Sequence, residues 1–222
     1  DRVRLAAAVG GFRGRSLANL QHVLPARFDQ TCIARSNAAS AAGAPRVEET
    51  RISQARVFLE RFTRAGAGIQ RRPGIHYPVL VPNEQGYDRA RAVGVEEVAV
   101  FTAASEAFNR TNTNAGIDES LARFEPILRR AAADGVRVRG YVSTVLGCPY
   151  QGEVPLADVV RVARALHQMG CYEISLGDTI GVANPKQVRD VLSRVLAETP
   201  APDVAVHFPD TRGTALANIL ES

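Results

Sequence analysis

The sequence predicts an α/β protein of the TIM-type (β/α)8 barrel class. Short strand patterns alternate with helical patterns from about residue 67 onward, and successive strands begin roughly 20–40 residues apart, which is typical of repeated βα units and a parallel sheet. Polar residues also follow the strand patterns again and again, as they do at the active face of a barrel. An open, doubly wound sheet would favour a G-x-G-x-x-G turn, and the sequence contains none.

Five segments have the pattern of buried strands. Each is short, rich in Val, Ile or Tyr, and followed by a polar or glycine-containing turn. Their parallel arrangement would bring the carboxyl end of each strand to one edge of the sheet. The predicted strands are 76–81, 97–102, 136–144, 172–176 and 204–208.

Four amphipathic segments between these strands predict helices. Asn184 followed by Pro185 has the pattern of an N-cap and a first helical residue. Gly135 and Gly170 stand where two helices should end before the next strand. The predicted helices are 84–93, 119–133, 156–169 and 185–197.

The first 66 residues have a weaker pattern. The segments 2–9 and 45–50 are candidates for the first two strands. A barrel of this type has about 250 residues, so a chain of 222 residues is short. We therefore expect a single (β/α)-barrel domain over residues 1–222 that is short of a full barrel.

Charge and cysteine content exclude several classes of protein. The net charge is +4, but the arginines are scattered and are not interleaved with stacking aromatic residues, so nucleic-acid binding is not expected. No apolar run reaches the ~18 residues of a membrane span. The three cysteines are odd in number and have no C-x-x-C spacing, which argues against a disulfide framework or zinc site and favours a cytoplasmic location.

Three segments carry polar residues with two interpretations each. Cys148 is either a structural thiol in a loop or a reactive one. Asp178, which follows a buried strand with Thr179, is either a site carboxylate or the cap of the next helix. His207 is predicted on the interior face of its strand, where it is either a core histidine or a metal ligand that needs further donors.

Long motifs resemble the 3-hydroxy-3-methylglutaryl-CoA lyase family. The two most specific are GYVSTVLGCPY at 140–150 and GCYEISLGDTIGV at 170–182. The resemblance covers roughly residues 67–218 in order, with weaker echoes at 8–14 and 41–50, so residues 1–66 are expected to diverge from the family. Shorter supporting segments are HYPVLVPN at 76–83, EVAVFTAASEAFNRTN at 97–112 and TALAN at 214–218.

The resemblance implies a TIM-type barrel that binds Mg2+ or Mn2+ and cleaves 3-hydroxy-3-methylglutaryl-CoA to acetoacetate and acetyl-CoA, a reaction of leucine degradation and ketone-body formation. The cation would orient the substrate and stabilise the alkoxide, while a positioned acid would protonate the enolate. The partner would be this or a related acyl-CoA, with no nucleic acid or membrane, and a homodimer is possible.

Residue by residue, the resemblance implies three groups of site residues. Arg13, Glu48 and Asp178 would be catalytic. His207 would be a metal ligand. The substrate-binding candidates are Ser105, Arg139, Ser143, Ser175 and Thr179.

The chain departs from the family pattern at two expected metal ligands. Pro209 stands where the second histidine of an H-x-H pair should be, and Gly14 stands where an aspartate should follow Arg13. The ligand set is therefore incomplete. The resemblance also implies a barrel that lacks its last βα unit at the carboxyl end, because the family's last strand lies beyond Ser222. We expect turnover to need His at 209, Asp at 14 and a final βα unit. Two alternatives stay open: a metal-dependent aldolase or acyl-CoA condensing enzyme of the same barrel group, and a catalytically inactive CoA-ester binder.

Overall fold

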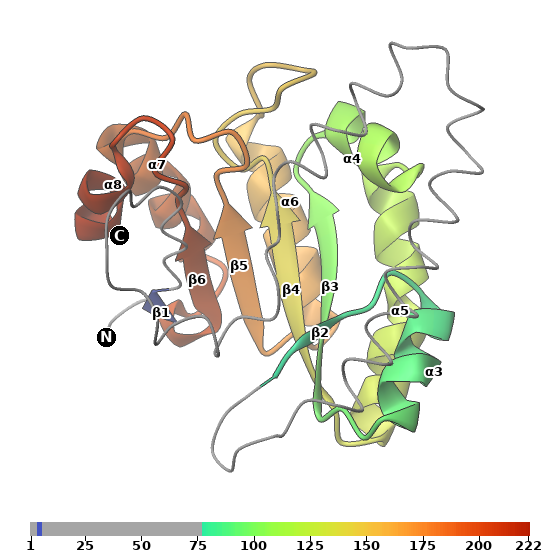
Figure 1. Ribbon diagram of the computed structural model, residues 1–222. Helices are drawn as coiled ribbons and strands as arrows, with labels where there is room; N and C mark the ends of the chain where they lie inside the picture. The colour runs from blue at the N-terminus through green and yellow to red at the C-terminus, as the bar shows by residue number, and fades with distance from the viewer. Residues whose placement is uncertain (1–3, 6–76) are drawn as a thin grey trace, which may run out of the picture. The chain divides into compact units, whose positions relative to one another are not determined.

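A computed structural model describes residues 4–5 and 77–222. Within them, six strands form one parallel sheet in the order β1-β6-β5-β4-β3-β2 (Figure 1). The five consecutive strands from β2 to β6 are neighbours in the sheet, so each crossover advances by one strand. The strands are β1 (Arg4–Leu5), β2 (Val79–Leu80), β3 (Glu97–Ala103), β4 (Arg137–Ser143), β5 (Glu173–Gly177) and β6 (Val204–His207).

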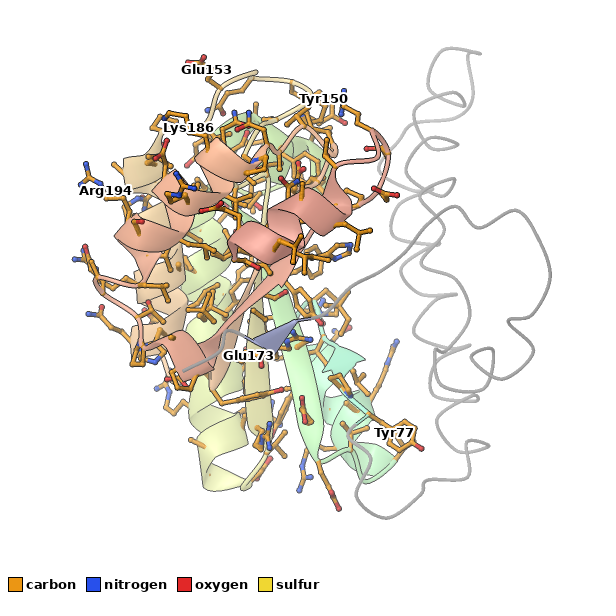
Figure 2. The ribbon with its side chains drawn as sticks, turned by 90° about the vertical axis from the view of Figure 1, so that its left-hand side faces the viewer. Tyr77, Tyr150, Glu153, Glu173, Lys186 and Arg194 are labelled. Carbon is orange, nitrogen blue, oxygen red and sulfur yellow. The ribbon has the colours of Figure 1, made fainter. Side chains whose placement is uncertain are left out.

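Helices cover one face of this sheet (Figures 1 and 2). Helix α5 packs on β3 and β4, and α6 packs on β4 and β5. A doubly wound sheet would carry helices on both faces and reverse its strand order. The regular order with helices on one face confirms the predicted (β/α)-barrel class. The helices are α3 (Glu84–Ala92), α4 (Glu106–Thr113), α5 (Ile117–Ala133), α6 (Leu156–Gln168), α7 (Pro185–Val195) and α8 (Ala215–Glu221), with a 3-10 turn at Ala201–Asp203.

The predicted strands and helices of the described part are all present, with ends displaced by a few residues at most. The strand predicted at 76–81 differs most. Over residues 77–81, Val79 and Leu80 pair with β3, and the Val81 N–H donates to the Ala99 carbonyl at 2.8 Å. Two helices were not predicted. Helix α4 is rich in Asn and Thr, which are weak helix formers, and α8 has only seven residues, so neither shows a clear apolar period.

Strand β4 shows how the two faces of the sheet differ. Val138, Gly140 and Val142 face the helices, and a Cβ added at Gly140 would lie 3.2 Å from side-chain atoms of both Ile174 and Leu166. The alternate residues Arg137, Arg139, Tyr141 and Ser143 therefore lie on the opposite face, which is the interior face in a barrel. The strand register places His207 and Glu173 on this same interior face.

Helix ends follow the predicted signals. The Asn184 side chain accepts a hydrogen bond from the Gln187 N–H while the Gln187 side chain accepts from the Asn184 N–H, which is a complete capping box before Pro185. Gly135 and Gly170 both have positive φ where helices give way to strands, as predicted. Among the described residues, no helix combines the length and apolar character needed to span a bilayer.

Candidate functional site

The carboxyl edge of the sheet brings the predicted site residues of three strands together. Strands β4, β5 and β6 end at Ser143, Gly177 and His207. Ser143 pairs with Ala103 on β3, and Gly177 pairs with His207. Because paired residues of parallel strands point to the same face, Ser143 and His207 both lie at the mouth of the interior face.

His207 is the titratable group at this mouth whose pKa is clearly shifted. Burial lowers the pKa of the imidazole, the nearby charge of Asp178 raises it, and that of Arg139 lowers it further, with a net decrease. The ring is therefore neutral at pH 7. A neutral imidazole can bind a metal ion or accept a proton, which is the chemistry expected of this residue.

Asp178 lies next to His207 and is almost fully buried. Its backbone N–H donates to the His207 carbonyl at 3.0 Å. Its two carboxylate oxygens accept from the N–H groups of Val182 at 3.1 Å and Ala183 at 2.8 Å. The carboxylate thus holds the loop that leads into α7 and contributes negative charge beside His207. It does not cap α7, because Asn184 is the N-cap of that helix, and its part as a site carboxylate stays a prediction.

Thr179 faces the end of β4. Its hydroxyl oxygen accepts a hydrogen bond from the Thr144 N–H at 2.7 Å. A hydroxyl that accepts through one lone pair keeps its own hydrogen for another acceptor. Thr179 therefore joins two loops of the carboxyl edge and can still donate to a bound molecule.

Cys148 lies in a tight loop between β4 and α6. Its N–H and carbonyl form two hydrogen bonds with Gly152, at 2.8 and 3.0 Å. The buried sulfur is 3.0 Å from the Ser105 hydroxyl and accepts from the N–H groups of Tyr150 and Gln151, each at 3.4 Å. The thiol is thus enclosed by the loop, which agrees with the structural interpretation.

Ser105 is fully buried and caps α4 by accepting from the Phe108 N–H at 3.1 Å. Its hydroxyl also reaches the Gln151 side chain at 2.8 Å. The Ser105 side chain is fully buried in this placement, and its predicted contact with substrate stays a prediction. Ser105 connects the start of α4 with the Cys148 loop, a role that no sequence pattern indicated.

Arg139 and Ser175 lie deeper on the interior face. Ser175 is two residues, or roughly 7 Å, below the end of β5 and is buried. Arg139 pairs with Glu173, with 2.5 Å between Nε and Oε1, although the N–H bond does not point at that oxygen. Its Nη1 donates to the Tyr141 hydroxyl at 2.9 Å. The guanidinium thus lies beneath the mouth, where its charge acts on His207.

Other predicted ligands are not gathered here. Arg13, Gly14 and Glu48 lie outside the described residues. Pro209 follows the end of β6, and Asp210 accepts from the Ala215 N–H at 3.1 Å near the start of α8. Residues 77–222 contain no group of three His, Cys, Asp or Glu side chains placed to hold a metal ion. The described donors alone therefore do not fit a complete divalent-cation site.

Sequence reasoning missed the close packing between the loops of this edge. A Cβ added at Gly181 would lie 1.8 Å from the Thr211 Oγ1, and one added at Gly147 would lie 2.8 Å from the Val182 Cγ2. The Arg212 guanidinium also donates to the carbonyls of Ile180 and Gly181. The glycines of both long motifs thus allow neighbouring loops to touch. These glycines were visible in the sequence, but their packing role was not predicted from it.

Comparison with known proteins agrees with this architecture. Residues 62–222 match the HMGL-like family. A hydroxymethylglutaryl-CoA lyase described as mitochondrial, from Bos taurus, is 52% identical over 183 residues, which are 82% of this chain and 56% of the relative. The chain spans about half the length of the curated relatives it matches.

Two solved structures are similar over the same part of the chain. The hydroxymethylglutaryl-CoA lyase from Pseudomonas aeruginosa has a TM-score of 0.69 at 53% identity, covering 72% of this chain and 53% of that one. An HMG-CoA lyase from Acenitobacter baumannii, in complex with coenzyme A and 3-methylmalate, has a TM-score of 0.68 at 31% identity, covering 72% of this chain and 52% of that one.

Proposed function

The chain belongs to the HMGL-like family, and on that premise we propose that it acts in carbon–carbon bond cleavage of 3-hydroxy-3-methylglutaryl-CoA or a closely related acyl-CoA. The observation that carries the proposal is His207, a neutral imidazole at the carboxyl edge beside Asp178. The choice of reaction is supported by relatives that are about 50% identical in sequence and are named as lyases of this substrate.

Each described residue has a proposed part in this site. His207 binds a divalent cation or accepts the hydroxyl proton of the substrate. Asp178 holds the loop before α7 and adds negative charge beside that imidazole, which favours a bound cation. Ser143 and Thr179 offer hydroxyl groups at the mouth, and Ser175 and Arg139 support it from below.

A divalent cation, Mg2+ or Mn2+, is proposed as the cofactor. When bound, such an ion polarises substrate oxygens and lowers the cost of an alkoxide. One imidazole is a weak site for it, so further donors must come from outside the described residues, where Arg13 and Glu48 remain proposed site residues. A cytoplasmic location and assembly into a homodimer are likewise proposed for this chain.

The test is release of acetyl-CoA from 3-hydroxy-3-methylglutaryl-CoA by the folded chain, with Mn2+ and then with EDTA. We expect no release from the unaltered chain. We expect metal-dependent release once Gly14→Asp, Pro209→His and a final βα unit are added, and His207→Gln should then abolish it. His167→Gln is the matched control and should leave release unchanged. The His167 imidazole belongs to the last turn of α6 and lies 3.1 Å from Asp203, not at the carboxyl edge of the sheet. Release that survives both EDTA and His207→Gln would contradict the proposal.

The incomplete donor set favours one second candidate, a metal-independent binder of CoA esters. It predicts no acetyl-CoA release and acyl-CoA binding that is the same with Mn2+ and with EDTA. Isothermal titration with 3-hydroxy-3-methylglutaryl-CoA separates the two candidates, because a cation requirement for binding would exclude the second.

A further inference from the structure

Thr144 has a backbone conformation that is rare for its residue type. It follows the last residue of β4, is fully buried, and has φ of +60°. A β-branched residue in the left-handed region is sterically unfavourable, because its Cβ approaches its own backbone. A conformation of this kind persists only where surrounding contacts hold it.

Hydrogen bonds on both sides of Thr144 supply such contacts. The Thr144 N–H donates to the Thr179 Oγ1 at 2.7 Å. On one side of it, the Ser143 carbonyl accepts from the Ala104 N–H at 2.9 Å. On the other, the Val145 N–H donates to the Gly177 carbonyl at 3.2 Å. The bond to Thr179 is the one of these that a side chain provides.

The conformation of Thr144 sets the direction of the following loop, residues 145–152. This loop lies at the carboxyl end of the sheet, where Figure 2 shows Tyr150 far from Glu173 at the start of β5. Gly147 packs closely on Val182, and the Cys148 sulfur is enclosed beside Ser105. A return of Thr144 to negative φ would move Gly147 and Cys148 together away from these partners, because both residues follow Thr144 in the same loop.

We propose that Thr179 is a positioning residue, whose hydroxyl holds Thr144 in the left-handed conformation and thereby keeps the loop 145–152 closed at the mouth of the site. The two long motifs contain the ends of β4 and β5. On this proposal, the hydrogen bond between Thr144 and Thr179 couples the loops that follow these two strands. Only the kinetic consequence of this inference rests on the proposed function, since loop closure itself can be measured without turnover.

Alkylation of Cys148 measures the closed state. The full chain is treated with iodoacetamide, and each cysteine is followed by peptide mass spectrometry. Thr179→Val removes the acceptor without changing the shape, and loss of a hydrogen bond to a buried donor should increase the Cys148 rate by about tenfold. Thr179→Ser keeps the acceptor and should react within about twofold of the original chain.

Cys171 is the internal control, because it is buried against Gly140 on the helix side of the sheet. Its rate should stay unchanged in Thr179→Val. An unchanged Cys148 rate, or an equal rise at both cysteines, would overturn the proposal. Should Thr179→Val not fold, hydrogen exchange in the original chain decides: the Thr144 amide should be protected, and exchange as fast as in an exposed loop would overturn it.

A double-substitution experiment separates this role from a direct contact with substrate. Glycine occupies positive φ without strain, whereas alanine keeps the Cβ. Thr179→Val should therefore speed Cys148 alkylation by about tenfold in a Thr144→Ala background and by less than about threefold in a Thr144→Gly background. Equal effects in the two backgrounds would overturn the proposal.

In chains that turn over 3-hydroxy-3-methylglutaryl-CoA, an open loop should increase KM in Thr179→Val more than it lowers kcat, and Thr144→Gly should restore part of the loss. A reduced kcat with unchanged KM would contradict the kinetic consequence. If the chain restored at positions 14 and 209 and extended by a final βα unit also shows no turnover, the proposed function is contradicted and the alkylation result remains the decisive measurement.

Discussion

The two edges of the sheet are both polar, but they are built differently. At the amino edge, charges in the strands pair with one another: Arg139 pairs with Glu173, and Arg137 lies 3.8 Å from the nearly buried Glu97. The Arg137 guanidinium also lies 3.9 Å from the centre of the Tyr172 ring. Burial, and then the hydrogen bond to Glu97, raises the pKa of Tyr172 to about 12.

At the carboxyl edge, polar side chains bind backbone groups of loops instead. Asp178 accepts from two backbone N–H groups, and Thr179 accepts from one. Within residues 77–222 the His207 side chain forms no hydrogen bond, and the charges of Asp178 and Arg139 shift its pKa in opposite directions. The side chains of the amino edge thus pair with one another across neighbouring strands, whereas those of the carboxyl edge hold the loops next to the His207 imidazole.

The largest expected loss of stability comes from breaking an ion pair at the amino edge. Glu173→Leu leaves the buried Arg139 charge without its partner and should destabilise the fold by about 3–5 kcal/mol in urea unfolding. Adding Arg139→Met should recover most of this loss, because an apolar pair avoids the cost of burying charges. Glu198→Gln, which alters a surface pair with Arg164, should cost less than about 1 kcal/mol. Similar losses for Glu173→Leu and Glu198→Gln would show that the amino edge is not a special region.

A smaller effect compares one glycine from each edge. Gly135 and Gly181 have nearly equal φ, +67° and +65°, but a Cβ has open space at Gly135 and meets Thr211 at Gly181. Gly135→Ala should cost about 1–2 kcal/mol for the left-handed conformation alone. Gly181→Ala should cost about 3 kcal/mol, since the Thr211 Oγ1 can rotate away but its Cβ, at 3.1 Å, cannot.

Thermal unfolding of the two alanine variants gives the measurement. Equal losses of Tm would mean that the loops of the carboxyl edge can separate at no cost. That outcome would remove close loop packing from the description of this edge.

Asp178→Asn tests the carboxylate of the carboxyl edge. An amide keeps one acceptor oxygen but turns an NH2 group toward the second backbone N–H, so we expect a loss of about 2 kcal/mol in urea unfolding. Asp190→Asn is the control, because Asp190 pairs with Lys186 on the surface of α7 and should change stability by less than about 0.5 kcal/mol. A neutral result for Asp178→Asn would assign the loop position to other contacts.

The smallest effect is the pH dependence that comes from His207. Burial lowers its pKa below the 6.5 of an unfolded histidine, so the unfolded chain binds more protons between these two values. His207 should therefore reduce stability as pH falls from about 6.5 through that window and should have no effect at higher pH.

Urea unfolding at pH 7.5 and 5.5 tests this dependence. His207→Gln should lose less stability than the original chain between the two pH values, while His167→Gln serves as the reference for a surface histidine. Parallel behaviour of the original chain and His207→Gln would show that His207 is not buried enough to shift its pKa.

Local signals explain how much of the fold was predictable. Short segments rich in Val and Ile, the Asn184-Pro185 start of α7 and the glycines at 135 and 170 act over a few residues. The part of the chain that the structure describes contains each element predicted there. Helix α4 was missed because its helical state depends on the Ser105 cap and on burial of Phe108 and Asn109 rather than on propensity.

The candidate site was predictable in part for the same reason. Strand alternation was enough to place His207 on the interior face, and position at a strand end was enough to bring it near Asp178. Burial of the Ser105 hydroxyl could not be predicted, since it depends on the Cys148 loop, 43 residues away in the chain. The predicted strand 2–9 overlaps β1 at Arg4–Leu5, whereas the expectations for Arg13, Glu48 and the strand 45–50 lie outside the described part and stay predictions.

The sequence by itself determined the family, the order of strands and helices, and the residues that reach the carboxyl edge, because periodicity and long motifs are properties of the chain. Only the tertiary structure decided which of those residues are engaged. The left-handed Thr144, its bond to Thr179 and the contact between Gly181 and Thr211 join segments about 30 or more residues apart. Such contacts exist only after the loops have packed, so no local pattern encodes them.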